Sequence, residues 1–242
     1  MFEYTVKEDK AKIDSIIRQY LTFADEASLE DLSIFVSLDT TPLTILGLSS
    51  QGTVVATGDE ALTFAPQLRQ WTNIRELYFG KYSGARRGFV VGLREDGTVV
   101  STDQNLFRLG DWGNIERIAT GEDLIIGILS DGRVRATGNN DYGQCNVASW
   151  TDVVRIYPGK TCVVGLRADG TLLVSGRNHY NQHEAEEWTD IREVYITYGV
   201  SGAEYIYGLR GDGTLLRTDP GGSRVILTDL LVPTTCISRV FG

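Results

Sequence analysis

The sequence predicts an all-β protein built from a repeated hairpin, and three observations carry this prediction. The 242 residues include 27 glycines and only 5 prolines, and 42% of them are hydrophobic, which is typical of short apolar strands joined by tight turns. A segment of the form Gly-Leu/Ile-x-x-x-Gly-x-Val/Leu occurs five times. A second segment, which begins with tryptophan, precedes each of the last four copies.

Each copy of the first segment predicts a β-hairpin. Its turn glycines are Gly52, Gly97, Gly132, Gly170 and Gly213. Four of them follow an aspartate, and Asp-Gly is the preferred centre of a type I′ turn, in which both residues have positive φ. The flanking residues are apolar and often β-branched, as in strands. An earlier glycine in each copy weakens the strand, so we expect it to admit a neighbouring backbone at Gly47, Gly92, Gly127, Gly165 and Gly208.

All four tryptophans occupy one position of the repeat. Trp71, Trp112, Trp150 and Trp188 are each followed two residues later by Asn or Asp and then by Ile or Val. A short apolar strand follows, so one unit is a strand and a hairpin in roughly 40 residues. We expect the tryptophans to pack as wedges between neighbouring units. A row of ligand-binding tryptophans is the alternative.

Units of three strands must stack, because they cannot bury both faces alone. A ring leaves fewer exposed edges than an open stack, so the sequence predicts a β-propeller. Five repeats are complete. Residues 2–6 and 236–241 also have strand patterns, and pairing them would form a sixth blade shared by the two termini. The alternative is an open arc that associates with itself through its edges.

The repeat resembles that of the regulator-of-chromosome-condensation family. The best copy runs from Asp131 to Trp150 and contains Gly138-Asn139-Asn140-Asp141-Tyr142-Gly143-Gln144, which is similar to the family's Gly-x-Asn-x-x-Gly-Gln segment. The short period is similar to bacterial members, including the class of a streptomycete β-lactamase inhibitory protein. The resemblance covers residues 29–242 and implies a propeller with three main strands per blade that acts through protein contacts.

Residues 1–28 are expected to form a strand and one amphipathic helix that pack on the propeller, within a single domain. Ile13, Ile16, Ile17, Tyr20 and Leu21 fall on one face of a helix. The alternative is a helix that docks onto a partner.

Composition restricts the partners and the compartment. The formal net charge of -9 repels phosphate backbones, so no nucleic-acid partner is expected. No apolar run is long enough for a membrane span, and no signal peptide is visible at the start, so a soluble, cytoplasmic protein is predicted. An odd number of cysteines, namely Cys145, Cys162 and Cys236, does not predict a disulfide framework.

Sequence motifs for catalysis are missing. There is no Gly-x-Ser-x-Gly elbow, phosphate-binding loop or Cys-x-x-Cys pair. His179 and His183 are four residues apart without a third ligand in register, so neither a metal nor a cofactor is expected. The turn aspartates Asp96, Asp131, Asp169 and Asp212 are expected to serve backbone geometry rather than catalysis.

The sequence therefore predicts a non-catalytic scaffold that binds a protein through loops on one face. Residues 80–89 and 198–205 form long loops rich in Tyr, Gly and Ser, the composition of recognition loops. The predicted partner-binding residues are Tyr82, Arg86, Arg87, Asn140, Tyr142, His179, Tyr180, Tyr198 and Tyr205. The predicted structural residues are the four tryptophans with Gly97, Gly132, Gly170 and Gly213. Two alternatives remain open: a propeller enzyme or carbohydrate-binding protein with a polar site at the ring centre, and a structural subunit of a larger assembly.

Overall fold

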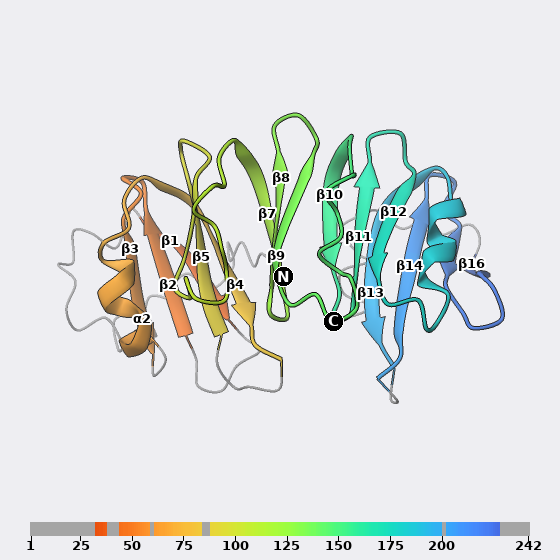
Figure 1. Cartoon of the computed structure of the whole chain (residues 1–242), viewed down its shortest axis with the longest axis horizontal. Coiled ribbons are helices and arrows are strands. Elements are labelled where there is room, and N and C mark those ends of the chain that lie inside the picture. The colour runs from red at the N-terminus through yellow and green to blue at the C-terminus, as the bar shows by residue number, and fades with distance from the viewer. Residues whose placement is uncertain (1–31, 38–43, 59–60, 84–87, 200–201, 228–242) are drawn as a thin grey trace. The chain divides into compact units, whose positions relative to one another are not determined.

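The computed structural model describes residues 32–37, 44–58, 61–83, 88–199 and 202–227 (Figure 1). The chain divides into two compact units, Met1–Gln104 and Asn105–Gly242, which are described separately. The predicted terminal strands at 2–6 and 236–241 and the predicted helix around residues 13–21 lie outside the described residues.

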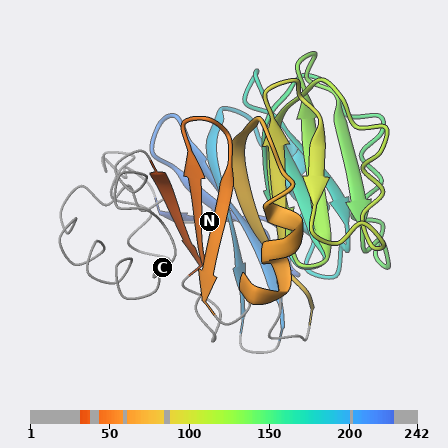
Figure 2. The same cartoon turned by 90° about the vertical axis from the view of Figure 1, so that its left-hand side faces the viewer.

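The first unit contains two three-stranded antiparallel sheets with consecutive strand order. Their strands are β1 (Leu32–Ser37), β2 (Thr44–Ser49), β3 (Val54–Gly58), β4 (Ile74–Lys81), β5 (Gly88–Arg94) and β6 (Val99–Ser101). One helix, α2 (Ala61–Leu68), connects the two sheets and packs against β3. Figure 2 shows this helix beside the first sheet.

The second unit repeats the same meander in three sheets. Their strands are β7 (Ile115–Gly121), β8 (Leu124–Leu129), β9 (Val134–Gly138), β10 (Val153–Pro158), β11 (Cys162–Arg167), β12 (Leu172–Gly176), β13 (Ile191–Tyr198), β14 (Glu204–Arg210), β15 (Leu215–Arg217) and β16 (Arg224–Leu227). A short 3-10 helix, η2 (Gln182–Glu187), lies against β12. The prediction of repeated strand-plus-hairpin units is confirmed, and β16 extends the last sheet to four strands.

The hairpin turns differ from the predicted type I′. Gly97 has φ +77°, whereas the φ of Asp96 is not positive. The N–H of Gly97 donates to the carbonyl of Arg94 at 3.0 Å, and the N–H of Arg94 donates to the carbonyl of Thr98 at 2.9 Å. This pattern is a type I turn followed by a left-handed glycine, so the loop has three residues. The type I′ prediction was wrong because Asp-Gly suits both the two-residue type I′ loop and this three-residue loop. Only the register of the two strands sets the length of the loop.

The turn aspartates stabilise this geometry through their side chains. Asp96 Oδ1 accepts hydrogen bonds from the N–H and the hydroxyl of Thr98, at 2.9 and 2.7 Å. Asp169 binds Thr171 in the same way, at 2.9 and 2.6 Å. Hydrogen bonds from the residue two positions later lower the pKa of the carboxyl group in all four Asp-Gly turns. These carboxylates are therefore occupied by their own turns.

This geometry predicts a pH dependence of stability. The native pKa values lie below the unfolded ones, so the stabilisation is complete above about pH 4 and is lost as the pH falls through the native values. Replacing Asp96, Asp131, Asp169 and Asp212 together with Asn keeps an acceptor that does not titrate. We expect the urea midpoint of the natural chain to fall further between pH 6 and pH 3 than that of this variant. Equal falls would contradict the assignment.

Each tryptophan of the repeat packs on the mid-strand glycine of its own sheet. A Cβ atom at Gly208 would lie 2.7 Å from Trp188 Cε3, and one at Gly165 would lie 2.8 Å from Trp150 Cζ3. The expectation of a neighbouring backbone was therefore wrong at Gly92, Gly127, Gly165 and Gly208, because an indole ring occupies this space. Trp188 is 4% exposed and shares a buried cluster with Leu166 of β11 and Val194 of β13, so it joins two consecutive sheets.

Backbone hydrogen bonds also join consecutive sheets of the second unit. The N–H of Ile191 donates to the carbonyl of Gly170 at 2.9 Å, and the N–H of Val153 donates to the carbonyl of Gly132 at 3.0 Å. Asp190 has φ +57°, in the left-handed region that Asn and Asp tolerate better than most residues. This requirement explains why Asn or Asp recurs two residues after each tryptophan.

Across the described ranges, no helix is long and apolar enough to cross a membrane.

Candidate interaction face

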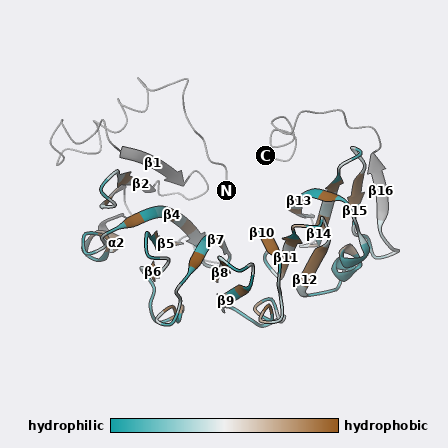
Figure 3. Ribbon diagram, turned by 90° about the horizontal axis from the view of Figure 1, so that it is seen from above, coloured by the Kyte–Doolittle hydropathy of each residue, from teal (hydrophilic) through white to brown (hydrophobic). Residues whose placement is uncertain are grey.

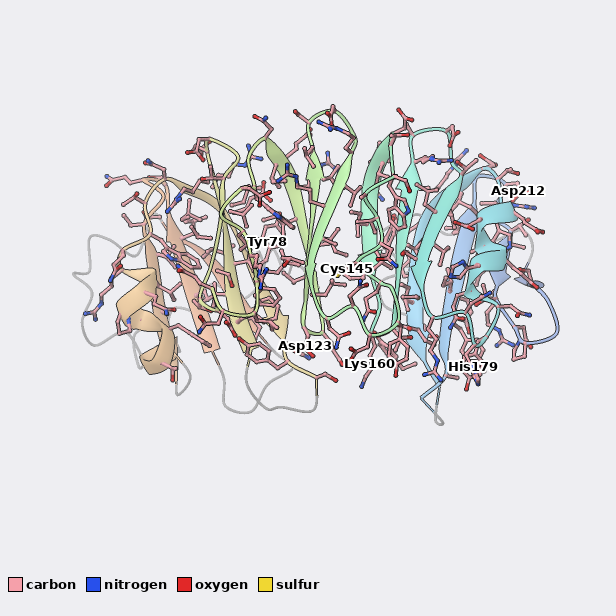
Figure 4. All side chains as sticks on the ribbon, in the orientation of Figure 1. Tyr78, Asp123, Cys145, Lys160, His179 and Asp212 are labelled. Atoms are coloured by element: carbon pink, nitrogen blue, oxygen red, sulfur yellow. The ribbon has the colours of Figure 1, made fainter. Side chains whose placement is uncertain are left out.

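The predicted partner-binding loops of the second unit lie at one edge of its sheets. The β7–β8, β10–β11 and β13–β14 turns share this edge, and β9 and β12 end there, because Gly138 pairs with Leu124 and Gly176 pairs with Cys162. Figure 4 shows Asp123, Lys160 and His179 at this edge and Asp212, in a glycine turn, at the opposite one. We call this edge the loop face, and define it by Tyr142, Lys160, Arg177, His179, Tyr180, Tyr198, Tyr205 and Arg217.

Two arginines of the loop face lie over tyrosine rings. Arg177, just after β12, has its Cζ atom 5.1 Å from the ring centroid of Tyr142, which follows β9 in the preceding sheet. Arg217, at the end of β15, has its Cζ atom 5.1 Å from the ring centroid of Tyr205. Such contacts attract a cation to the negative face of the ring and stabilise both side chains by about 0.5–1 kcal/mol at exposed sites.

The aromatic cluster continues around Tyr205. The ring centroid of Tyr180 is 5.4 Å from that of Tyr205, and His179 meets Tyr180 edge-on at 5.5 Å. Tyr198, at the end of β13, is 56% exposed. The loop face therefore presents tyrosines from the β9–β10 and β12–β13 connections and from the two strands at the β13–β14 turn.

Buried glutamines support the two connecting loops in the same way. Gln144 Oε1 accepts the N–H of Tyr142 at 3.0 Å, and its amide donates to Asn139 Oδ1 at 2.9 Å. Gln182 Oε1 accepts the N–H of Tyr180 at 2.9 Å, and its amide donates to the carbonyl of Glu204 at 2.8 Å. The Tyr-x-Gln recurrence was visible in the sequence, but this backbone support was not predicted.

Asn140 shapes its own loop, although it is among the predicted partner-binding residues. Its Oδ1 atom accepts the N–H of Cys145 at 2.8 Å, and its Nδ2 atom donates to Asn146 at 3.2 Å. Burial raises the pKa of the neighbouring Cys145 thiol to about 11, so this thiol is protonated at neutral pH.

A buried carboxylate connects two sheets beneath the loop face. Glu204, the first residue of β14, is 3% exposed. It accepts the N–H groups of Lys160 and Thr161 at 2.6 and 3.1 Å, and also the hydroxyl of Thr161. A Cβ atom at Gly159 would lie 2.1 Å from Glu204 Oε1, so glycine leaves room for the carboxylate. Burial and then the charge of Glu204 raise the pKa of the Cys162 thiol.

Glu204 was not predicted from the sequence. It begins a strand of ordinary β pattern, and no motif marks it. Its partners lie more than 40 residues away in the chain.

The remaining predicted residues belong to the first unit or lie outside the described residues. Tyr82 belongs to the first unit, where its hydroxyl donates to Asp103 Oδ2 at 2.8 Å. Arg86 and Arg87 lie outside the described residues. A ring nitrogen of His183 lies 3.1 Å from the carbonyl of Gly176. The described residues contain no group of three side chains that could hold a metal ion.

A separate polar network joins β10 and β13, which are the first strands of two consecutive sheets in the second unit. Figure 3 shows β7, β10 and β13 on one side of this unit and β9 and β12 on the other. Glu193 accepts hydrogen bonds from Arg155 Nη1 and from the Tyr157 hydroxyl, both at 2.6 Å. Burial and then Glu193 raise the pKa of Tyr157. The Glu193 carboxylate is therefore held in a structural ion pair.

These sheets, with Trp71, Trp150 and Trp188 in buried clusters that join consecutive sheets and a glycine turn at one edge, define a repeat protein of the β-propeller class. Residues 115–144 match the model of the family described as Regulator of chromosome condensation (RCC1) repeat. The neighbouring sheets repeat the same strands and turns, so the repeated units of the chain are similar to the RCC1-type repeat. The closer likeness to short-repeat bacterial members stays a prediction.

Solved structures that this chain is similar to are distant from it in sequence. The ectodomain of the receptor kinase CR4 from Physcomitrella patens is 15% identical, with a TM-score of 0.51, over 78% of this chain and 53% of that chain. Prp20p from Saccharomyces cerevisiae is 18% identical, with a TM-score of 0.49, over 78% of this chain and 62% of that chain. The chain thus spans less than two thirds of the length of either structure. A comparison with curated proteins finds no match.

Proposed function

We propose that this chain is a non-catalytic scaffold that binds a protein partner through the loop face. The observation that carries the proposal is the exposed tyrosine set of that face, in which Tyr142 is 49% and Tyr198 is 56% exposed. Tyrosine offers a large contact area and few rotatable bonds, so it loses little entropy on binding. RCC1-type propellers are commonly protein-binding scaffolds, which supports this role.

The supporting residues favour a preformed binding surface. Gln144 and Gln182 are 2% and 0% exposed, and each holds the backbone of one tyrosine in place. A surface that is already ordered loses less entropy when a partner binds. The loop face therefore has the properties of a protein-recognition surface.

The contacts of the carboxylates favour a non-catalytic role. The turn aspartates are bound to their own loops, Glu193 to Arg155 and Tyr157, and Glu204 to the β10–β11 turn. A general acid or base must be free to reach a substrate proton. These carboxylates stabilise the sheets and their joints instead.

The proposal predicts that a Tyr142→Ala, Tyr198→Ala double variant loses its partner. Both side chains are exposed, so the fold is expected to survive. A partner captured from host lysate by the natural chain should bind the double variant at least tenfold more weakly, a loss of about 1.4 kcal/mol or more.

The matched control is Leu106→Ala, which removes another exposed side chain, 39% accessible, from the second unit. It should bind like the natural chain. Equal capture by the double variant would show that the partner uses another surface.

A further inference from the structure

The charges of the loop face are paired, with one exception. Lys160 Nζ lies 3.3 Å from Glu122 Oε2, and Arg217 Nη2 lies 2.6 Å from Asp219 Oδ2. Arg177 forms no ion pair with any residue of the described ranges. Its backbone N–H donates to the carbonyl of Thr161 at 2.9 Å, while its guanidinium lies over Tyr142.

The acidic residue next to Tyr142 in the sequence forms no ion pair with Arg177. Asp141, which precedes Tyr142, accepts a hydrogen bond from the side-chain amide of Asn139 at 3.0 Å. Its own backbone N–H donates to Asn139 Oδ1 at 3.0 Å, which holds this aspartate in a tight local turn. Both the carboxylate and the backbone N–H of Asp141 are therefore bonded to Asn139 within the same loop.

The guanidinium of Arg177 donates no hydrogen bond to any residue of the described ranges, so its donors are available. The guanidinium group is planar and carries five N–H donors along its edge. The contact with the Tyr142 ring attracts the charge and uses none of these donors in a hydrogen bond. Such a group can still bind a carboxylate through two parallel hydrogen bonds.

A second site on the same face shows how such a pair is completed. Arg217 lies over Tyr205 at 5.1 Å, as Arg177 lies over Tyr142, and Asp219 supplies a carboxylate at 2.6 Å. The Arg177–Tyr142 pair is likewise an arginine over a tyrosine ring, but no carboxylate of the described residues binds its guanidinium.

We propose that a protein partner supplies the missing carboxylate, so that an Asp or Glu side chain of the partner binds Arg177. The inference rests on the proposed function and names the chemistry that the loop face recognises. The chain carries a formal net charge of -9, which repels a highly acidic partner at long range. The segment that fits is therefore one acidic residue among neutral or basic neighbours.

The test is a selection of random 12-residue displayed peptides on the full chain, followed by binding measurements with synthetic peptides. The selected peptides are expected to share an Asp or Glu. Changing that residue to Asn or Gln should weaken binding by roughly tenfold or more. Arg177→Gln should cause the same loss, and the two changes together should cause little further loss, because they remove one interaction.

Two variants sharpen the test. Arg177→Lys keeps the charge without the planar fork and should recover only part of the affinity. Arg192→Gln removes an exposed arginine that lies against Gly211, at the edge of the sheet opposite to the loop face, and should bind every selected peptide like the natural chain.

Failure has two distinct forms. Peptides that depend on Tyr142 and Tyr198 but bind Arg177→Gln unchanged would overturn the carboxylate site and leave the proposed function standing. A selection that yields no peptide sensitive to any loop-face variant would overturn both.

Discussion

Replacing Trp188 with alanine is expected to lower the free energy of unfolding by about 4 kcal/mol, the usual range for a buried tryptophan. The ring is 4% exposed, packs on Gly208, and donates from Nε1 to the hydroxyl of Ser223 at 3.0 Å. Its removal leaves a cavity in the cluster that joins the sheets on either side. Chemical denaturation, followed by circular dichroism, measures the loss.

A double-mutant cycle with Gly208 tests the packing itself. Gly208→Ala alone should cost about 1–3 kcal/mol, because the new methyl group would lie 2.7 Å from Trp188 Cε3. Combined with Trp188→Ala, it should cost much less, since the methyl group then enters vacant space. Additive losses would show that the glycine serves another purpose.

Gly110 provides the matched control for this cycle. A Cβ atom there meets nothing within 4 Å, and Gly110 has no positive φ. Gly110→Ala is expected to change the free energy of unfolding by less than about 0.5 kcal/mol.

Replacing Glu204 with alanine is expected to cost about 3 kcal/mol. Hydrogen bonds to a buried carboxylate stabilise by about 1.5–3 kcal/mol each, and the substitution leaves the N–H groups of Lys160 and Thr161 without an acceptor. The estimate is below the sum of the bonds because the substitution also removes the desolvation penalty of the charge.

Hydrogen exchange locates the effect of this change. The amides of Lys160 and Thr161 should exchange faster in Glu204→Ala, since they lose their acceptor. Glu204→Gln keeps the shape but turns one acceptor into a donor, so it should fall between the natural chain and the alanine variant. A free energy of unfolding within about 0.5 kcal/mol of the natural value would refute the assignment of Glu204 as a connection between sheets.

Local sequence signals were sufficient for the repeating unit. Strand patterns and turn glycines depend on neighbours within about ten residues, so the hairpins could be located one by one. The tryptophan positions marked the joints, and the turn aspartates were correctly expected to serve the backbone. The turn type was missed because Asp-Gly fits two loop lengths that differ only in register.

The sequence by itself thus determined the hairpin and the residues that recur around it, because these depend on short-range patterns. Only the tertiary structure decided that Arg177 lies over Tyr142, that Glu204 binds the turn at Lys160, and that the tryptophan ring rests on a glycine. The first two contacts bring together residues that are 35 and 44 positions apart in the chain, across the joint between two sheets. Such contacts depend on how one sheet packs against the next, which no local pattern encodes.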